Sequence, residues 1–221
     1  MGSSRLPGKA LKKIGNYNLI DWVIKYAKKN FNSEEIFVAT TTSKNDDKLV
    51  EYLSSKKITL FRGSEKNVFS RFESISKNFN KNDIIVRFTG DNPIKSNSVI
   101  QSMKQKVMKN NIDYCCLRNL SKLAVEFIKI KLLDEIQSKK FFDILDIEHV
   151  TWNIRKKLKC SKLIINQEDF DMEPNLDRLI TVDTSYDLSF LDEIVKKLDI
   201  APGEDLNIAS LYKFIKNVKS N

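Results

Sequence analysis

The sequence predicts an α/β protein: a mixed sheet flanked by helices. Strand and helix signals alternate through the first half of the chain. Apolar runs such as residues 35–40 and 83–88 have the length and bounding turns of buried strands. Between them, apolar side chains recur at helical spacing, as in residues 46–53. This alternation is typical of a sheet with helices on both faces.

The elements of the first half follow from local signals. Asn18 is a favourable N-cap for a helix over residues 19–27, whose apolar positions recur every three or four residues. After the strand over 35–40, Asp46 and Asp47 stand in the first turn of a helix, where acidic side chains suit the helix dipole. The elements that follow are a strand over 58–61, an amphipathic helix over 68–79 and a strand over 83–88.

The strand over 83–88 has to stop pairing in the turn that follows it, because Pro93 has no N–H to donate. Ligands of open α/β sheets bind at such carboxyl ends of strands. Asp187 falls in the first turn of a later helix with Thr184 or Ser185 as the cap, so we expect it to be structural. The remaining elements are helices over 96–110, 186–198 and 208–215, and strands over 114–117, 125–130, 163–166 and 179–182.

Length and composition indicate one globular domain. The 221 residues are 41% hydrophobic and 30% charged, which is ordinary for a protein with a single sizeable core. No apolar run approaches the roughly 18 to 20 residues of a membrane span, so we expect a cytoplasmic protein without a membrane partner. Three cysteines, two of them adjacent, argue against a disulfide framework or a zinc site, and Cys115 and Cys116 are expected to be free thiols in a strand.

The net charge of +9 raises the question of nucleic-acid binding. Most of the cations are lysines in pairs that are spread over several helix faces, which is more typical of a solvated surface than of a binding stripe. We therefore expect no nucleic-acid partner. An excess of positive charge also suits an enzyme with anionic substrates.

The first eleven residues have the composition of a phosphate-binding loop. Gly2, Ser3 and Ser4 leave room for backbone N–H groups to converge on an anion. Arg5 can contact two phosphate oxygens, and Lys9 supplies a mobile charge after a Pro-Gly turn. The loop is neither a Walker A motif nor a dinucleotide fingerprint. On these residues alone, an anion site and an ordinary polar turn remain equally open.

The loop is followed by further motifs in a fixed order: Val38-Ala39-Thr40-Thr41, Phe61-Arg62-Gly63-Ser64-Glu65, Val86-Arg87-Phe88-Thr89-Gly90-Asp91-Asn92-Pro93, Glu148-His149-Val150-Thr151 and Leu179-Ile180-Thr181-Val182-Asp183-Thr184. Together with the loop they resemble the cytidylyltransferases that make CMP-activated sugars, and among them the branch of spore coat polysaccharide biosynthesis protein F. The resemblance runs from Met1 to about residue 198.

The resemblance implies a single nucleotidyltransferase domain over residues 1–221, of the Rossmann-like nucleotide-diphospho-sugar-transferase fold. Its implied parts are a nucleotide-binding half (1–110), an acceptor-binding and dimerisation half (111–200) and a C-terminal helix (201–221). It also implies a homodimer that uses CTP and Mg²⁺ to activate an acidic sugar for surface polysaccharide synthesis, with release of pyrophosphate. The alternatives are another nucleotide, a non-sugar acceptor such as a phosphonate or polyol phosphate, and an inactive nucleotide-binding relative.

The resemblance also implies roles for individual residues. Asp91 and Asp183 would hold Mg²⁺, which prefers a few carboxylates together with phosphate oxygens and water. The implied catalytic residues are Arg5, Lys9 and Asp91; the nucleotide-binding residues are Gly2, Ser3, Ser4, Arg5, Lys9, Ala39, Thr40, Arg62, Gly63 and Ser64; the acceptor-binding residues are Glu126, Glu148 and His149. The alternatives are strand-end turns or helix caps for the two aspartates, exposed loop polarity for the strand-end residues and a hydrogen-bonded structural role for His149.

The chain departs from the family pattern in two places. Ala124 replaces an aspartate of the usual Gly-Leu-Asp-Val-Glu, which affects the expected acceptor rather than the nucleotide. The family also opens with an apolar strand that leads into the phosphate loop, whereas Met1 stands within the loop itself. We therefore expect the fold to lack its usual first strand, with Met1 an internal methionine of a longer product.

Overall fold

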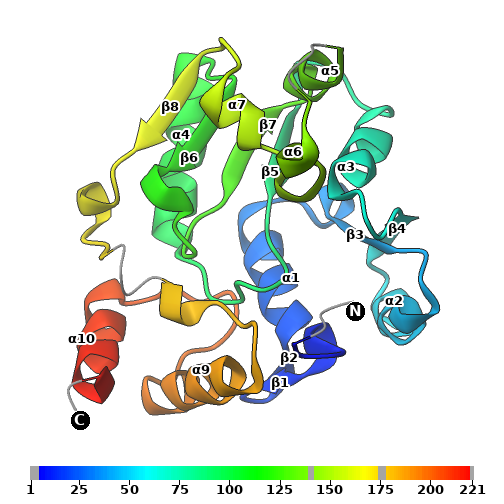
Figure 1. Ribbon diagram of the computed structural model, residues 1–221. Coiled ribbons are helices and arrows are strands. Elements are labelled where there is room, and N and C mark those ends of the chain that lie inside the picture. Colours follow the sequence, from blue (N-terminus) through cyan, green and yellow to red (C-terminus); the bar gives the residue numbers. More distant parts are fainter. Residues whose placement is uncertain (1–4, 139–141, 174–177, 220–221) are drawn as a thin grey trace.

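The computed structural model describes residues 5–138, 142–173 and 178–219 (Figure 1). Among these residues, the largest sheet has four strands. The strand order is β5-β7-β6-β8. β7 runs antiparallel to both β5 and β6, whereas β8 runs parallel to β6. The sheet is therefore mixed, as the sequence predicts. The strands are β5 (Ile84–Arg87), β6 (Tyr114–Leu117), β7 (Glu126–Lys129) and β8 (Lys162–Ile165).

Two smaller sheets come from the amino-terminal part of the chain. β3 (Phe37–Thr41) and β4 (Thr59–Gly63) form a parallel pair, and β1 (Lys13–Ile14) and β2 (Tyr17–Asn18) form a short antiparallel pair. In the described part of the chain, the β3–β4 pair shares no strand pairing with the four-stranded sheet. Figure 1 shows β3 and β4 to the right of that sheet, next to α2 and α3.

Helices cover both faces of the four-stranded sheet. Successive side chains of a strand point to opposite faces, so the apolar side chains of these strands are buried on both. Cys115 and Phe127 belong to a core that includes residues of the helices α1, α4, α9 and α10. Their neighbours Tyr114, Cys116 and Ile128 belong to a second core with residues of α3, α5 and α7. The two cysteines are free and buried in a strand, which confirms the expectation.

The helices are α1 (Leu19–Asn30), α2 (Asp47–Ser55), α3 (Val68–Ser76), α4 (Asn97–Asn110), α5 (Lys131–Ser138), α6 (Ile144–His149), α7 (Trp152–Lys156), α9 (Ser185–Lys197) and α10 (Ile208–Lys219). The short 3₁₀ helices are η1 (Lys9–Leu11), η2 (Ser33–Glu35), η3 (Lys44–Asp46), η4 (Arg118–Leu120), η5 (Gln167–Phe170) and η6 (Arg178–Ile180). Among the described residues, no helix is long and apolar enough to cross a bilayer.

The predicted helix caps are confirmed. The Asn18 side chain and Asp21 form a capping box at the start of α1. Thr184 and Asp187 form another at the start of α9, where the Asp187 carboxylate accepts from the backbone N–H of Asp183 and of Thr184. These contacts satisfy N–H groups that the first turn of a helix leaves unpaired.

The predicted strand over residues 179–182 is wrong. Arg178–Ile180 form the 3₁₀ helix η6, and Thr181 and Val182 are not part of a sheet. Ile180 and Val182 are fully buried in the main core, so burial against helices, rather than strand pairing, accounts for the apolar pattern. The backbone N–H of Val182 donates instead to the carbonyl of Asp91, at 2.9 Å.

Candidate functional site

Two cations from the first turn of the chain meet one carboxylate from near its other end. Gly8 adopts a positive φ of 70°, which glycine tolerates, and reverses the chain ahead of η1. Lys9 Nζ lies 3.2 Å from Asp183 Oδ1 and donates to the carbonyl of Val182 at 3.0 Å. Arg5 Nη2 lies 3.1 Å from Asp183 Oδ2. The structure therefore brings together Arg5, Lys9 and Asp183.

The turn after β5 lies against the same segment. Besides the backbone bond from Val182 to Asp91, the Thr181 hydroxyl donates to Asn92 Oδ1 at 2.8 Å. Asn92 Nδ2 donates in turn to the Thr89 hydroxyl. These bonds fix the turn on both sides of Asp91 and place it beside the segment that carries Asp183. One oxygen of Asp91, Oδ1, is buried and has no hydrogen-bond partner.

The two aspartates fit the ligand set that Mg²⁺ takes from proteins. A buried carboxylate oxygen without a donor is costly, and a cation would satisfy it. Mg²⁺ is held by one or two carboxylates plus phosphate oxygens and water, so Asp91 and Asp183 are enough. Over the described ranges, no cluster of three or more His, Cys, Asp or Glu suits a metal ion.

The residues expected to border the nucleoside end two neighbouring strands. Thr40 pairs with Arg62, and Thr41 with Gly63, at the carboxyl ends of β3 and β4. The Thr40 hydroxyl is buried and donates to Asp46. Arg62 donates to the carbonyls of Thr41 and Ser43 and pairs with Asp47. Both side chains thus hold the turn after β3, while Ala39 and Gly63 are half-buried and Ser64 is exposed.

Arg71 of α3 lies at the same strand ends and was not anticipated from the sequence. Its Nη1 lies 3.4 Å from the Ala39 carbonyl, and its Nε is buried without a partner. Burial lowers the pKa of this guanidinium. A methyl group at Gly63 would lie 2.8 Å from both Arg71 Cγ and Phe61 Cε1, so a larger residue there would require these side chains to shift. The Phe-Ser-Arg-Phe run of α3 has the apolar spacing of a helix, and nothing in it indicates that Arg71 reaches the ends of β3 and β4.

Glu126, expected to contact the acceptor, is buried and fully engaged. Its Oε1 accepts from Arg87 Nη1 at 2.5 Å, and its Oε2 accepts from the hydroxyls of Tyr114 at 2.5 Å and Thr151 at 2.7 Å. Burial alone would raise the pKa of this carboxyl, but the Arg87 charge and these hydrogen bonds hold it below its ordinary value. Glu126 is therefore ionised and fixed.

Glu148 and His149, the other two residues of the acceptor prediction, end α6 with exposed side chains. His149 lies near the ring of Trp152, at 6.4 Å between centroids. It is Thr151, from the same motif, that reaches Glu126. Gly2, Ser3 and Ser4 lie outside the described residues.

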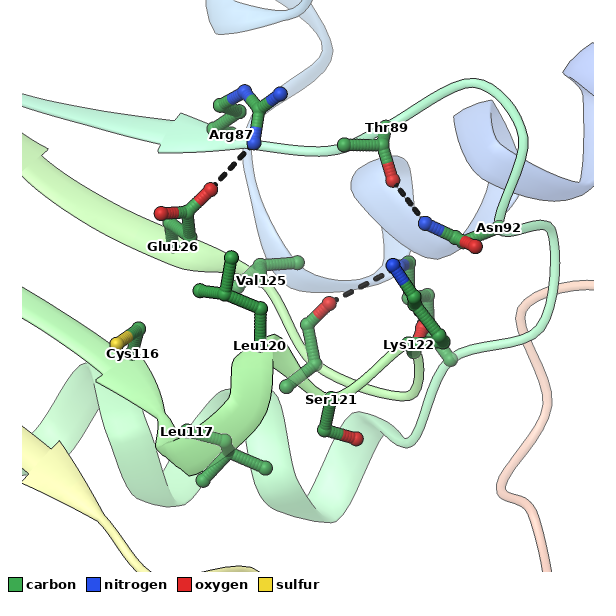
Figure 2. Close-up of a pocket in the computed structure, with 12 residues that line it drawn as sticks. Arg87, Thr89, Asn92, Cys116, Leu117, Leu120, Ser121, Lys122, Val125 and Glu126 are labelled. Atoms are coloured by element: carbon green, nitrogen blue, oxygen red, sulfur yellow. Dashed lines mark hydrogen bonds and ion pairs between the residues drawn. The ribbon is translucent and has the colours of Figure 1, made fainter. Parts of the chain in front are cut away.

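A pocket lies between the turn after β5 and the segment that joins β6 to β7 (Figure 2). Its volume is about 60 Å³, and Thr89 and Asn92, on either side of Asp91, form part of its wall. Cys116 also faces it, but burial raises the pKa of this thiol to about 11, which leaves it protonated. The lining residues are Arg87, Thr89, Asn92, Lys95, Cys116, Leu117, Leu120, Ser121, Lys122, Ala124, Val125 and Glu126. We refer to this as the strand-end pocket.

Two cations and a carboxylate that meet beside the turn after a sheet strand are typical of an α/β enzyme that handles nucleotide phosphates. The fold agrees with this class. A cytidylyltransferase from Leptospira borgpetersenii is 25% identical over the whole chain and 92% of its own, with a TM-score of 0.82. A CMP-2-keto-3-deoxy-manno-octonic acid synthetase, solved with CTP, has a TM-score of 0.65 at 13% identity, over 89% of this chain and 95% of its own, and shows the fold alone.

The chain belongs to the cytidylyltransferase family, whose model matches residues 1–220. Among its relatives, the uncharacterised protein MJ1063 of Methanocaldococcus jannaschii is 33% identical over all of this chain and 91% of its own length. The spore coat polysaccharide biosynthesis protein SpsF of Bacillus subtilis is 30% identical over 70% of this chain and 66% of its own. These matches confirm the resemblance that the ordered motifs indicate.

Proposed function

We propose that this chain transfers the cytidylyl group of CTP to a hydroxyl group of an acidic sugar and releases pyrophosphate. The observation that carries the proposal is the meeting of Arg5, Lys9 and Asp183 beside Asp91, whose buried Oδ1 has no partner. The names of two relatives support it: SpsF is a polysaccharide biosynthesis protein, and a Fusobacterium nucleatum relative is a 3-deoxy-manno-octulosonate cytidylyltransferase.

In the proposed reaction, the acceptor oxygen forms a bond to the α-phosphorus and the bond between that phosphorus and the β-phosphate oxygen breaks. Pyrophosphate leaves, and the proton of the acceptor hydroxyl passes to solvent. Arg5 and Lys9 bind the triphosphate and neutralise the charge that grows on the leaving group. Asp91 and Asp183 hold Mg²⁺, which when bound neutralises the phosphates and orients them for attack.

Pyrophosphate release tests the proposal. We expect release with CTP, Mg²⁺ and an acidic sugar, and much less with ATP, GTP or UTP, or with chelator. Asp91→Asn should abolish most of the turnover without a change in melting temperature, because it removes one ligand charge and keeps the shape of the side chain. The matched control is Asp169→Asn, the same change on the exposed surface.

The other readings are separate outcomes of this assay. Release with a polyol phosphate or a phosphonate in place of the sugar would replace the acceptor and keep the nucleotide. Binding of CTP without release for any acceptor would make the chain a nucleotide-binding relative. Full magnesium-dependent activity of Asp91→Asn would refute the assignment of the metal site.

A further inference from the structure

The strand-end pocket carries an excess of positive charge next to the candidate metal site. Three cations, Arg87, Lys95 and Lys122, line it together with one carboxylate, Glu126. Lys95 is almost fully buried, and its Nζ donates to the carbonyls of Lys122 and Ala124. A small pocket with this charge balance favours an anionic group over a neutral one.

Glu126 lines the pocket but is already held by hydrogen bonds from other residues. Both of its oxygens already accept hydrogen bonds, one from Arg87 and the other from Tyr114 and Thr151, and the residue is only 6% exposed. These three partners come from β5, from β6 and from the turn after α6. The carboxylate therefore holds elements together, and Arg87 is the one of its partners that faces the pocket.

Arg87 has donors to spare at the pocket wall. Its guanidinium carries five N–H groups in a fixed plane, of which Nη1 donates to Glu126. Among the described residues, its other N–H groups have no hydrogen-bond partner, although the side chain is only 15% exposed. Figure 2 shows Arg87 joined to Glu126 on one side of the pocket, with Thr89 joined to Asn92 beside them. A held guanidinium of this kind is suited to an oxyanion, which it contacts with two N–H groups at once.

We propose that Arg87 binds the oxyanion of the acceptor, and that Glu126 is a positioning residue that acts through Arg87. The inference rests on the proposed function, and it identifies the residue that selects an anionic acceptor. The oxyanion is a carboxylate in a sugar acid and a phosphate in a polyol phosphate. Lys122, which also lines the pocket, adds positive charge that attracts either group.

The test is direct binding, measured by isothermal titration calorimetry in the presence of CTP. The probes are 3-deoxy-manno-octulosonate, its neutral carboxamide and glycerol phosphate. The wild type should bind one of the two anions at least tenfold more tightly than the carboxamide. Arg87→Gln should reduce the affinity for that anion by roughly tenfold or more, which corresponds to the loss of one charge-assisted contact. The affinity for CTP should stay within about twofold of the wild-type value. Lys48→Gln, the same loss of charge on the exposed face of α2, is the matched control.

Glu126→Gln separates positioning from contact. It should reduce the affinity for the anion by a smaller factor than Arg87→Gln does. Because it acts through Arg87, it should have no further effect on this affinity in an Arg87→Gln background. Arg87→Gln could fail to fold because it leaves the charge of Glu126 buried and unpaired. Two other variants then supply the comparison. The double variant Arg87→Gln with Glu126→Gln removes both charges, and Arg87→Lys keeps the positive charge at position 87.

Equal affinity of the wild type and the foldable Arg87 variants for the anion, or no preference for either anion over the carboxamide, overturns the inference. The proposed function fails differently. If the wild-type chain binds the anion through Arg87 and yet releases no pyrophosphate, the proposed transfer reaction is refuted. The assignment of Arg87 as the binding residue then still holds.

Discussion

Asp183 is the residue for which two proposed ligands have different consequences: a metal ion would bind its carboxylate, and a triphosphate would compete with it for the nearby cations. Its carboxylate pairs with Arg5 and Lys9, the two cations assigned to the triphosphate. Arg5 is 65% exposed, so its ion pair adds little to the stability of the fold. If Arg5 and Lys9 bind the triphosphate as proposed, Asp183 competes with the phosphate oxygens for their N–H groups, and a metal ion on Asp183 would weaken that competition.

Asp183→Asn should therefore change nucleotide binding in opposite directions with and without metal. In chelator, we expect CTP to bind several-fold more tightly than to the wild type, because Arg5 and Lys9 no longer face a competing carboxylate. With Mg²⁺, the gain in affinity that the metal gives the wild type should be reduced or lost. Isothermal titration of CTP under both conditions measures the two effects.

Asp169→Asn controls for the change in net charge and should behave as the wild type in both buffers. Weaker binding of CTP by Asp183→Asn in chelator would show that the carboxylate favours nucleotide binding. It would contradict the prediction that Asp183 competes with the phosphates for Arg5 and Lys9.

Glu126 should make folding stability depend on pH. Its pKa in the folded protein is held below the ordinary value of 4.5, so it contributes stability above that value and loses the contribution as the pH falls through the folded pKa. Glu126→Gln removes the charge and should cost about 1.5 to 3 kcal/mol at neutral pH. The difference between wild type and variant should then shrink as the pH falls below 4.5 and through the lowered pKa of Glu126.

Urea unfolding at a series of pH values gives this difference. Glu51→Gln, the same change on the exposed surface of α2, should lie near zero throughout. A constant difference between Glu126→Gln and the wild type would mean that shape, rather than charge, accounts for the cost.

Residue types and their order in the chain supplied the candidate site residues, but not which side chains are in contact. The motif with Glu126 was identified, but its binding partners were not, because Arg87 and Tyr114 are brought to it by strand register. Arg87 pairs with Glu126 across β5 and β7, a relation that is absent from the linear sequence.

At the scale of elements, the sequence predicted strands and helices wherever local signals and burial agree. Cys115 and Cys116 form part of a strand that is buried on both faces, as their apolar run suggested. Residues 179–182 carry the same signal and form no strand. Ile180 and Val182 satisfy it by packing among helices, and a buried loop that follows a 3₁₀ turn cannot be told from a strand by periodicity alone.

The capping box of α9 links the stability of a helix to the site, because Asp187 also accepts from the backbone N–H of Asp183. Asp187→Ala should lower the free energy of unfolding by about 1 kcal/mol, the usual effect of a lost cap. It should also weaken CTP binding, since the backbone that orients Asp183 is released. Chemical denaturation and CTP titration of one variant measure both.

Ser96 is the N-cap of α4, where its hydroxyl accepts from the N–H of Val99, and it serves as the comparison. Ser96→Ala should cost similar stability and leave CTP affinity unchanged. Equal effects of the two variants on CTP would mean that loss of stability alone, and not the contact with Asp183, reduces binding.

At the scale of the whole molecule, the candidate site is assembled from segments that are distant in sequence. The contact between Lys9 and Asp183 spans 174 positions, and the bond from Val182 to Asp91 joins the first half of the chain to the second. The order of the motifs could be read from the sequence, whereas their convergence depends on the topology of the sheet. The net charge of +9, in contrast, is a property of the sequence, and only the structure shows where its lysines lie.

Two of the lysine pairs lie on different faces of the molecule. Lys28 and Lys29 are exposed on α1, and Lys156 and Lys157 are exposed at the end of α7. The two helices pack on opposite sides of the four-stranded sheet. Backbone binding requires neighbouring cations that neutralise consecutive phosphates. We therefore expect a labelled duplex and a labelled single strand to bind no more tightly than about 10 µM at physiological salt, within the usual range of non-specific binding.

Fluorescence anisotropy over a salt series measures this, and two charge-matched variants decide what any residual binding means. Lys28→Gln with Lys29→Gln, and Lys156→Gln with Lys157→Gln, each remove two positive charges from a different face. If only the overall charge of the molecule attracts the strand, the two should weaken binding equally. Submicromolar affinity with a steep salt dependence, lost in one double variant and kept in the other, would instead locate a nucleic-acid surface on one face and contradict the prediction.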